Sequence, residues 1–188
     1  MWLFSGLRVL FLAVILALMG GFTAQGEEHD RQISVSVEPL AYVFDGAGIH
    51  LAYQPHQWRY TVEAFTLTVP RSLHGNGAFN SSMTTVELHI ERFFTEDRSG
   101  FFLGPEVAVG QSRIEHRESG DVEENIQYSV AARGGYRWYP GWSDFYFNPV
   151  AGLSVPLNSE DVTTHGETFE SGAFTPWATI GLGWSFDI

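Results

Sequence analysis

The last sixteen residues, 173–188, read AFTPWATIGLGWSFDI, and this stretch decides the fold. Apolar residues occupy every second position from Phe174 to Ile188. The residues between them are mostly Thr, Gly, Ser and Asp, with Trp177 as the exception. A repeat of two residues places alternate side chains on opposite faces of a β-strand. The stretch therefore predicts a long strand with one fully apolar face, which suits a wall that faces lipid.

The same alternation occurs repeatedly upstream and predicts an all-β chain. Seven further strands are expected at residues 33–44, 49–54, 60–69, 84–94, 101–113, 126–139 and 145–157. No segment has a convincing helical period. An even number of strands brings both ends of a barrel to the same side, and tilted strands of about 10 residues match an apolar band about 25 Å tall. We therefore predict a closed eight-stranded antiparallel up-and-down transmembrane β-barrel.

Alternation alone does not distinguish a membrane barrel from a soluble barrel, whose apolar face points inward. The other face of these strands carries Gly, Ser, Thr, Ala and Gln with few charges, and all ten basic residues of the chain are arginine. A soluble surface normally carries many Lys and Glu side chains. This favours the membrane barrel. A soluble periplasmic barrel that binds an apolar ligand is the alternative, and the direction of Ile180, Leu182 and Trp184 would distinguish the two.

The beginning of the chain has the features of a secretory signal peptide, which we place at residues 1–26. Arg8 precedes an apolar run at residues 9–19, and Ala24 and Gly26 supply small residues at the −3 and −1 positions of a cleavage site. The run is shorter than the about 20 residues of a spanning helix. We expect cleavage to leave a single barrel domain, residues 27–188, in the outer membrane of a diderm bacterium.

The charge balance excludes some functions. The chain has 22 acidic and 10 basic residues, a formal net charge of −12. Nucleic-acid binding needs a basic patch, and attraction to an anionic membrane surface needs basic segments. The glycines are scattered and form no phosphate-binding pattern. We therefore expect no nucleic-acid partner and no cofactor.

Connection lengths and aromatic residues suggest how the barrel lies in the membrane. The connections at 55–59, 95–100 and 140–144 are short and are expected to face the periplasm, whereas the longer loops at 71–83, 115–125 and 158–172 would face outward. Aromatic residues near the short turns predict a girdle at the membrane interface. They are Trp58, Tyr60, Phe93, Phe94, Phe101, Phe102, Trp138, Tyr139, Trp142, Phe145, Trp184 and Phe186.

The lumenal face of the predicted strands carries a set of charged residues. They are Glu38, Glu63, Glu87, His89, Glu91, Glu106, Arg133 and Arg137, with His50 nearby in phase. Such groups in a narrow lumen would pair and plug it. The best polar constellation among them is Glu87, His89, Glu91, Arg133 and Arg137, whose His and carboxylate groups could also bind a metal or relay protons. We favour the structural plug and predict no metal site.

The outer loops offer two further candidates for chemistry. Acidic residues crowd residues 115–124 and 160–170, where divalent cations could bridge them to lipopolysaccharide phosphates; no calcium-loop spacing is present, so solubilising charge is favoured. Ser72 and His74 are a nucleophile and a base in the third loop, but no third group is identifiable. We therefore predict no catalytic residue.

With this topology and this final strand, the chain resembles the small eight-stranded outer-membrane barrel proteins, the class that includes the OmpA membrane domain and OmpX. The resemblance covers residues 27–188 and implies no catalytic residues. It implies that the last strand, through Leu182, Trp184, Phe186 and Ile188, is the assembly signal for the barrel-insertion machinery. In that class this strand commonly ends in an aromatic residue, whereas this chain ends in Asp187 and Ile188.

The expected function is a structural or surface-interaction role, with acidic loops presented outside the cell. The expected partners are outer-membrane lipids, lipopolysaccharide, the barrel-assembly machinery during insertion and an extracellular ligand. The alternative is an outer-membrane enzyme that hydrolyses or transfers acyl chains of lipid A or phospholipid.

Overall fold

The computed structural model describes residues 31–96, 98–141 and 144–188. The predicted signal peptide and Trp142 therefore lie outside the described residues. The strands are β1 (Arg31–Val37), β2 (Ala47–Pro55), β3 (Trp58–Val69), β4 (Phe79–Phe93), β5 (Gly100–His116), β6 (Val122–Arg137), β7 (Phe145–Pro156), β8 (Val162–Thr164), β9 (Glu167–Phe169) and β10 (Thr175–Asp187). Two short helices are α2 (Pro39–Val43) and α3 (Arg71–His74). None of the described helices is long and apolar enough to cross a membrane.

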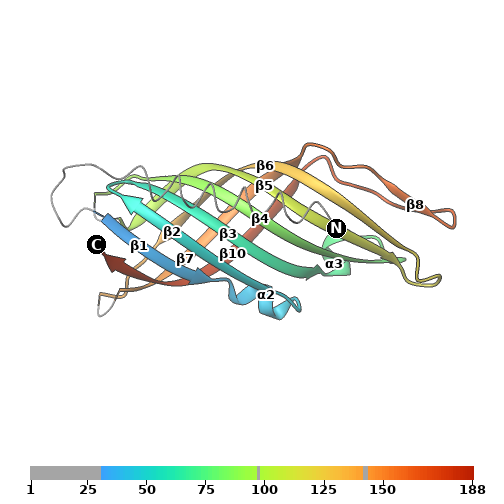
Figure 1. Ribbon diagram of the computed structural model, residues 1–188, viewed down its shortest axis with the longest axis horizontal. Coiled ribbons are helices and arrows are strands. Elements are labelled where there is room, and N and C mark those ends of the chain that lie inside the picture. Colours follow the sequence, from blue (N-terminus) through green and yellow to red (C-terminus); the bar gives the residue numbers. More distant parts are fainter. Residues whose placement is uncertain (1–30, 97, 142–143) are drawn as a thin grey trace, which may run out of the picture.

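Eight of the strands form a closed antiparallel barrel, in the order β1-β10-β7-β6-β5-β4-β3-β2 (Figure 1). The ring closes where β1 pairs with β10, from Gln32 opposite Asp187 to Val37 opposite Leu182. Each barrel strand pairs with its neighbours in the sequence, and the small β8–β9 hairpin lies in the connection between β7 and β10. The predicted eight-stranded up-and-down barrel is confirmed. Closure leaves no open sheet edge, which is a requirement for any sheet that crosses lipid.

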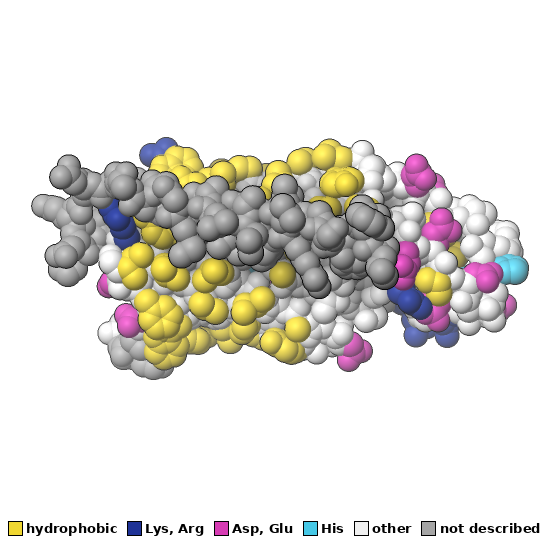
Figure 2. Space-filling view, in the orientation of Figure 1, with side chains coloured by type: hydrophobic (Ala, Val, Ile, Leu, Met, Phe, Trp, Pro, Cys, Tyr) yellow, Lys and Arg dark blue, Asp and Glu magenta, His cyan; other side chains and the backbone are white. Residues whose placement is uncertain are grey.

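The apolar face of the barrel points outward. On β2, Ile49 is 57% exposed whereas His50 is 5% exposed, and the alternation continues along the strand. On β10, Ile180 and Trp184 are exposed on the outer wall. Figure 2 shows apolar side chains over the barrel body and acidic side chains gathered beyond one end. Ile180 and Trp184, whose direction distinguishes the two kinds of barrel, therefore point away from the lumen. This rules out the soluble barrel with an apolar interior.

The first predicted strand, residues 33–44, is wrong beyond Val37. Residues Pro39–Val43 form α2, with Pro39 in its first turn and no side-chain cap at Glu38. Proline has no N–H to give to a strand ladder, but its fixed φ suits the first turn of a helix. The chain therefore leaves the sheet after β1 and turns across the barrel rim before β2 begins.

The predicted outer loops are also wrong in part, because strands continue through them. β4 begins at Phe79, which pairs with His116 at the end of β5, and Glu115 of β5 pairs with Val122 at the start of β6. The predicted loop at 158–172 contains the β8–β9 hairpin. These segments lie beyond the apolar wall, where both faces meet polar surroundings, so apolar alternation does not mark them. β5, β6 and the β8–β9 hairpin form a tip that projects at the right of Figure 1, opposite the C-terminus.

Candidate functional site

The barrel interior contains a carboxylate–histidine cluster, formed by Glu38, His50, Glu63, Glu87, His89, Glu106 and Arg133. Strand register brings its members together. His50 lies opposite Glu63 on β2 and β3, Glu63 lies opposite Glu87 on β3 and β4, and His89 lies opposite Glu106 on β4 and β5. Side chains on adjacent strands at one level are direct neighbours. The structure therefore groups six of the eight predicted lumenal residues with His50 around one level of the lumen.

Arg133 is the centre of one side of this cluster. Its Nη1 lies 3.2 Å from Glu106 Oε2 and 2.6 Å from His89 Nδ1, and its Nε lies 3.1 Å from Glu91 Oε1. His89 Nε2 is 3.1 Å from Glu87 Oε2 and 3.5 Å from Glu63 Oε2. A buried charge is tolerated only when it is paired and hydrogen-bonded. Arg133 therefore offsets several carboxylates that would otherwise repel one another.

The second side of the cluster is built around His50. Its Nε2 lies 3.0 Å from Glu63 Oε1 and 3.8 Å from Glu38 Oε1. Glu63 faces both sides, because its Oε1 points to His50 and its Oε2 to His89. His50 and Glu63 are buried, and Glu38 is partly exposed where the chain leaves β1. The two groups of three residues, Glu38 with His50 and Glu63, and Glu63 with Glu87 and His89, each have donor atoms within 4.8 Å of one another.

A second layer of the lumen, which we call the arginine layer, is formed by Gln54, Arg59, Glu91, Phe93, Phe102, Arg137 and Tyr146. Arg59 donates to Glu91 Oε2 at 3.2 Å and to the Tyr146 hydroxyl at 3.3 Å. Arg137 donates to Gln54 Oε1 at 2.8 Å and lies over the Tyr146 and Phe93 rings, 4.5 and 4.7 Å from their centroids. These large side chains are buried and fill the lumen at this level. Within the described residues Arg137 forms no ion pair, so its predicted role as a partner of carboxylates gives way to amide and aromatic contacts.

Sequence reasoning missed Arg59, Gln54 and Tyr146. Arg59 falls in the turn predicted at residues 55–59, although it lies four residues before Glu63 and therefore has the same strand parity. Tyr146 follows the outward Phe145 and so must point inward. Continuing the alternation of inward and outward side chains to the ends of each strand would identify these residues as lumenal.

The predicted girdle residues divide between the two faces. Trp58, Tyr60, Trp138, Trp184 and Phe186 are exposed on the outer wall. Phe93 and Phe102 are wrong as girdle residues, because they are 0% and 2% exposed and pack on each other with ring centroids 5.1 Å apart inside the barrel. Their neighbours Phe94 and Phe101 are the outward residues. Tyr139 also points inward, since its hydroxyl bonds Gln32 and Ser185.

The last strand places Leu182, Trp184, Phe186 and Ile188 along the outer side of β10 and its end, beside β1. Leu182 is half-buried and the other three are exposed. Trp184 contacts the Phe145 ring of β7 at 5.7 Å between centroids. The strand that would act as the assembly signal therefore also closes the barrel.

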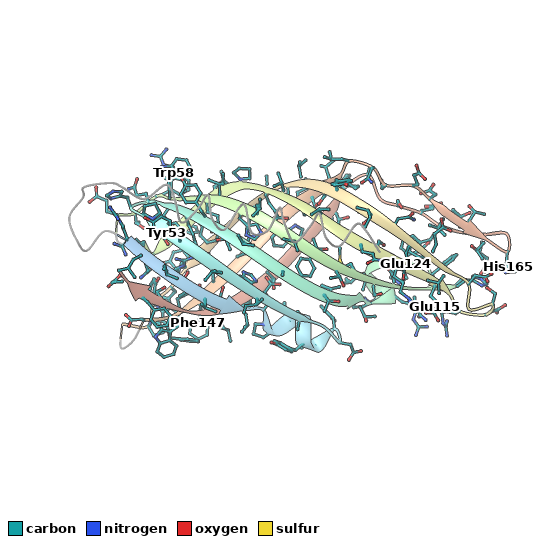
Figure 3. All side chains as sticks on the ribbon, in the orientation of Figure 1. Tyr53, Trp58, Glu115, Glu124, Phe147 and His165 are labelled. Carbon is teal, nitrogen blue, oxygen red and sulfur yellow. The ribbon has the colours of Figure 1, made fainter. Side chains whose placement is uncertain are left out.

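The projecting tip holds a polar contact between its two hairpins, which we call the outer clasp (His116, Ser119, Asp121, His165 and Glu167). His116 Nε2 lies 2.8 Å from Glu167 Oε2, and His165 Nε2 lies 2.8 Å from Asp121 Oδ2. The hydrogen bond with His165, followed by that with Ser119, lowers the pKa of Asp121. Figure 3 labels His165, Glu115 and Glu124 at this end. The clasp fastens the β8–β9 hairpin to the hairpin of β5 and β6.

The predicted loop residues Ser72 and His74 lie on α3 at the base of the tip. His74 Nδ1 accepts a hydrogen bond from the Asn76 backbone N–H at 3.1 Å, and its ring lies 5.4 Å from that of Phe169. Burial, and then the charge of Arg71, lower the pKa of His74. Among the described residues no hydrogen bond joins Ser72 to His74. The contacts of His74 are those of a packing residue.

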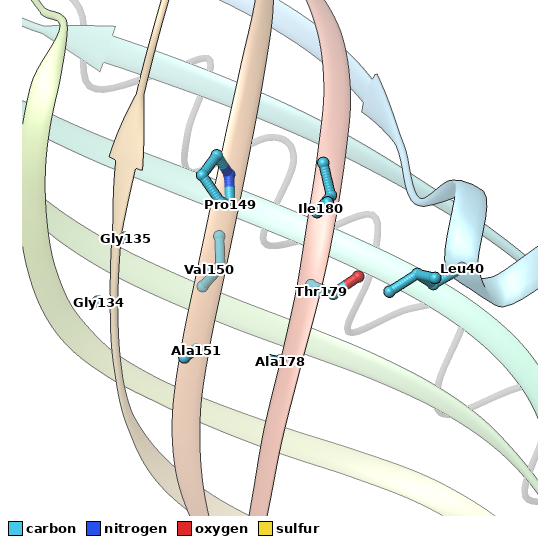
Figure 4. Close-up of a pocket in the computed structure, with 9 residues that line it drawn as sticks. All are labelled: Leu40, Gly134, Gly135, Pro149, Val150, Ala151, Ala178, Thr179 and Ile180. Atoms are coloured by element: carbon cyan, nitrogen blue, oxygen red, sulfur yellow. The ribbon is translucent and has the colours of Figure 1, made fainter.

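A groove of about 500 Å³ lies on the outer wall, across β6, β7 and β10 (Figure 4). Small side chains form its floor, including Gly134, Ala151 and Ala178, and Leu40 of α2 reaches its edge. These residues belong to the apolar exterior. The groove is therefore part of the lipid-facing surface rather than an opening into the lumen.

The structure of this chain is similar to solved structures of three other proteins. The N-terminal β-barrel domain of Pseudomonas aeruginosa OprF is similar over 86% of this chain and 100% of that domain, with 12% sequence identity and a TM-score of 0.48. Neisserial surface protein A is similar over 87% of this chain and 100% of its own, with 11% identity and a TM-score of 0.45. Ail, the attachment invasion locus protein of Yersinia pestis, solved with the heparin analogue sucrose octasulfate, covers 85% of this chain at 13% identity, with all of the Ail chain aligned and a TM-score of 0.43.

Neither the protein-family models nor the curated proteins include a match to this chain. The fold is that of a small outer-membrane barrel. This assignment rests on the closed ring of eight antiparallel strands and its apolar exterior, so the resemblance predicted from the sequence is confirmed at the level of fold. At these identities the likeness to the solved structures extends to the fold alone.

Proposed function

We propose that this chain is an integral outer-membrane protein that presents an acidic tip to positively charged partners outside the cell. The observation that carries the proposal is the division of its surface between an apolar barrel wall and a charged tip (Figure 2). An apolar wall of paired strands is stable in lipid, because every strand hydrogen bond is made within the ring. The tip, by contrast, needs water or a polar partner.

The filled lumen supports an anchoring role rather than a conducting one. Arg59, Arg137, Tyr146 and Phe93 are buried across the arginine layer, and Arg133 is buried in the cluster above it. An eight-stranded barrel has an interior just wide enough to be filled by side chains, whereas open aqueous channels need about 16 strands. The barrel therefore serves as a solid support for the tip.

The charge of the tip indicates the chemistry of its partner. Residues 113–124 and 158–170 contain nine acidic residues and two arginines. Some of these pair, as Arg113 does with Glu115 and Glu124, but most acidic side chains remain in excess. A negatively charged surface attracts positively charged partners and repels polyanions. We therefore expect cationic proteins or peptides to bind, and sulfated polysaccharides not to bind. The outer-membrane lipids, lipopolysaccharide and the assembly machinery remain expected partners of the barrel.

The binding experiment uses a charge reversal at the tip. Purified protein in zwitterionic detergent micelles is titrated with a cationic peptide and with heparin, at low and at physiological salt. Binding of the cationic peptide should weaken as salt rises, because a Debye length of about 8 Å at physiological ionic strength screens exposed charges. It should be lost in the Glu118→Lys/Glu123→Lys variant. Glu96→Lys, the same change at the opposite end, should leave it intact. Heparin binding stronger than peptide binding would refute the proposed partner chemistry.

Location and the absence of enzymatic activity are tested separately. Cell fractionation should recover the protein in the outer membrane, with migration on gels that changes on heating. Recovery in the soluble periplasmic fraction would exclude the proposed location. Mass spectrometry of lipid A and phospholipid with and without the protein should show one acyl pattern. An acyl pattern that changes when the unaltered protein is present, but not when the His74→Gln variant is present, would support the enzyme alternative instead.

A further inference from the structure

One corner of the carboxylate–histidine cluster, formed by Glu38, His50 and Glu63, has no arginine within hydrogen-bond distance among the described residues. Arg133 approaches the Oε2 side of Glu63, at 4.0 Å, and binds Glu106 and His89. The Oε1 atom of Glu63 points away from Arg133 toward His50. Within the described part of the chain, the ion pairs of Glu38 involve His50 alone. This corner therefore joins two carboxylates through a single imidazole.

The donor atoms of this corner are spaced like ligands of one ion. His50 Nε2 is 3.0 Å from Glu63 Oε1 and 3.8 Å from Glu38 Oε1, and the three donor atoms lie within 4.8 Å of one another. Zinc binds imidazole nitrogen and carboxylate oxygen at about 2.0–2.2 Å. Tetrahedral coordination at those bond lengths separates neighbouring ligand atoms by roughly 3.3–3.6 Å. The observed spacings lie on either side of that range.

The burial of His50 and the lack of a hydrogen bond to its Nε2 are a second indication of a bound ligand. His50 is 5% exposed, and its Nε2 makes no hydrogen bond although Glu63 Oε1 lies 3.0 Å away. A buried polar atom that makes no hydrogen bond is uncommon and calls for an explanation such as an ion. An imidazole nitrogen that lies 3.0 and 3.8 Å from two carboxylate oxygens can donate its lone pair to a cation held between them.

We propose that Glu38, His50 and Glu63 bind one divalent transition-metal ion of the zinc type inside the barrel. Imidazole combined with carboxylate favours borderline ions such as Zn²⁺ over Ca²⁺ and Mg²⁺, which prefer oxygen ligands alone. The ion adds positive charge beside Glu38 and Glu63, of which Glu63 has Arg133 at 4.0 Å and Glu38 forms its ion pair with His50. Three protein ligands leave a fourth position for water. Glu38, partly exposed beside α2 at the barrel rim, provides the side from which an ion enters.

The neighbouring group of Glu63, Glu87 and His89 has similar spacing but a different environment. Arg133 Nη1 lies 2.6 Å from His89 Nδ1 and 2.9 Å from His89 Nε2. The guanidinium therefore already brings positive charge to this group, and a second metal ion there would be repelled. This limits the proposal to one ion per chain.

The proposal is tested by metal titration of the whole folded protein without a histidine tag. The protein is treated with a chelator, dialysed in detergent and titrated with ZnCl₂ by calorimetry, and with CoCl₂ followed by visible absorption. One Zn²⁺ per chain should bind. The affinity should fall in His50→Gln and Glu63→Gln by at least the roughly 10- to 100-fold that loss of an outer-shell partner costs in other metal sites. CaCl₂ should not compete.

The matched control is His165→Gln, which removes a histidine from the exposed outer clasp and should leave zinc binding unchanged. Heat-modifiable migration checks that each variant forms the barrel. If His50→Gln does not form the barrel, Glu38→Gln at the partly exposed rim decides the question by the same titration. Absence of zinc binding, equal affinity in the lumenal variants and the unaltered protein, or binding lost only in His165→Gln would each overturn the proposal. These results do not depend on what the tip binds.

Discussion

At the scale of single residues, the lumen depends on charges that cannot be removed one at a time. Arg59 and Glu91 are 2% and 0% exposed, and their hydrogen bond spans β3 and β4 at directly opposed positions. Arg133 approaches the other oxygen of Glu91 at 3.1 Å. Each charge in this layer was taken out of water at a cost that only its partners offset. Loss of one partner therefore leaves a buried charge uncompensated.

We predict that Arg59→Ala lowers the free energy of unfolding of the barrel by about 3–5 kcal/mol, the cost of breaking a buried ion pair from one side. The measurement is urea unfolding in lipid vesicles, followed by tryptophan fluorescence. Arg113→Ala is the control, because its pairs with Glu115 and Glu124 are exposed and are expected to contribute about 0–1 kcal/mol. Equal effects of the two substitutions would show that Arg59 contributes no more than a surface arginine.

At the scale of elements, the tip is built by extending barrel strands past the membrane and fastening a separate hairpin to them. Phe79, Ile114 and Val162 form a small apolar core there, with Ala78 and Phe169 packed against it. The outer clasp adds polar contacts around this core. The β8–β9 hairpin therefore relies on side-chain packing rather than on the barrel sheet.

The packing of His74 makes the attachment of this hairpin depend on pH. The pKa of His74 is lowered in the folded protein, so folding favours its neutral form. Its contribution is fully present above the ordinary histidine pKa of about 6.5 and is lost as the pH falls through the lower folded value. Protonation would also remove the acceptor that Nδ1 offers to the Asn76 N–H. The hydrogen-exchange protection of residues 162–169, corrected for the intrinsic exchange rate, should therefore fall as the pH is lowered from 7 to 5.

The control for this prediction is His74→Phe, which keeps a ring beside Phe169 but cannot take up a proton. Exchange in this variant should not change with pH after correction for the intrinsic exchange rate. An equal loss of protection in the variant would assign the pH dependence to groups other than His74.

The alternation of apolar and polar residues is enough to predict the strands of the barrel wall, but not those of the tip. In the wall, lipid on one side and a narrow lumen on the other impose a strict alternation, which marked Ile49, Leu103 and Ile180 as outward. In the tip, no lipid contact enforces it, so the strand pairing of Phe79 with His116 left no apolar pattern. Strand parity identifies the lumenal carboxylates and arginines, but it does not tell which of them pair across the lumen. Contacts such as Arg59 with Tyr146 join strands far apart in sequence, and only the closure of the ring brings them together.

At the scale of the whole molecule, lipid surrounds the barrel wall and water surrounds the tip. A single substitution can show on which side of this boundary a residue lies. Val107 of β5 is exposed on the wall, whereas Val122 of β6 is exposed on the tip. Arginine on the lipid face of a barrel costs about 2–4 kcal/mol near the membrane midplane, and surface substitutions in water usually change stability by less than about 0.5 kcal/mol. We predict that Val107→Arg lowers the free energy of unfolding by about 2–4 kcal/mol, and that Val122→Arg has little effect. Unfolding in lipid vesicles measures both. A cost at Val122 as large as at Val107 would place the tip in lipid as well, and would remove the water-exposed surface on which the proposed partner binding depends.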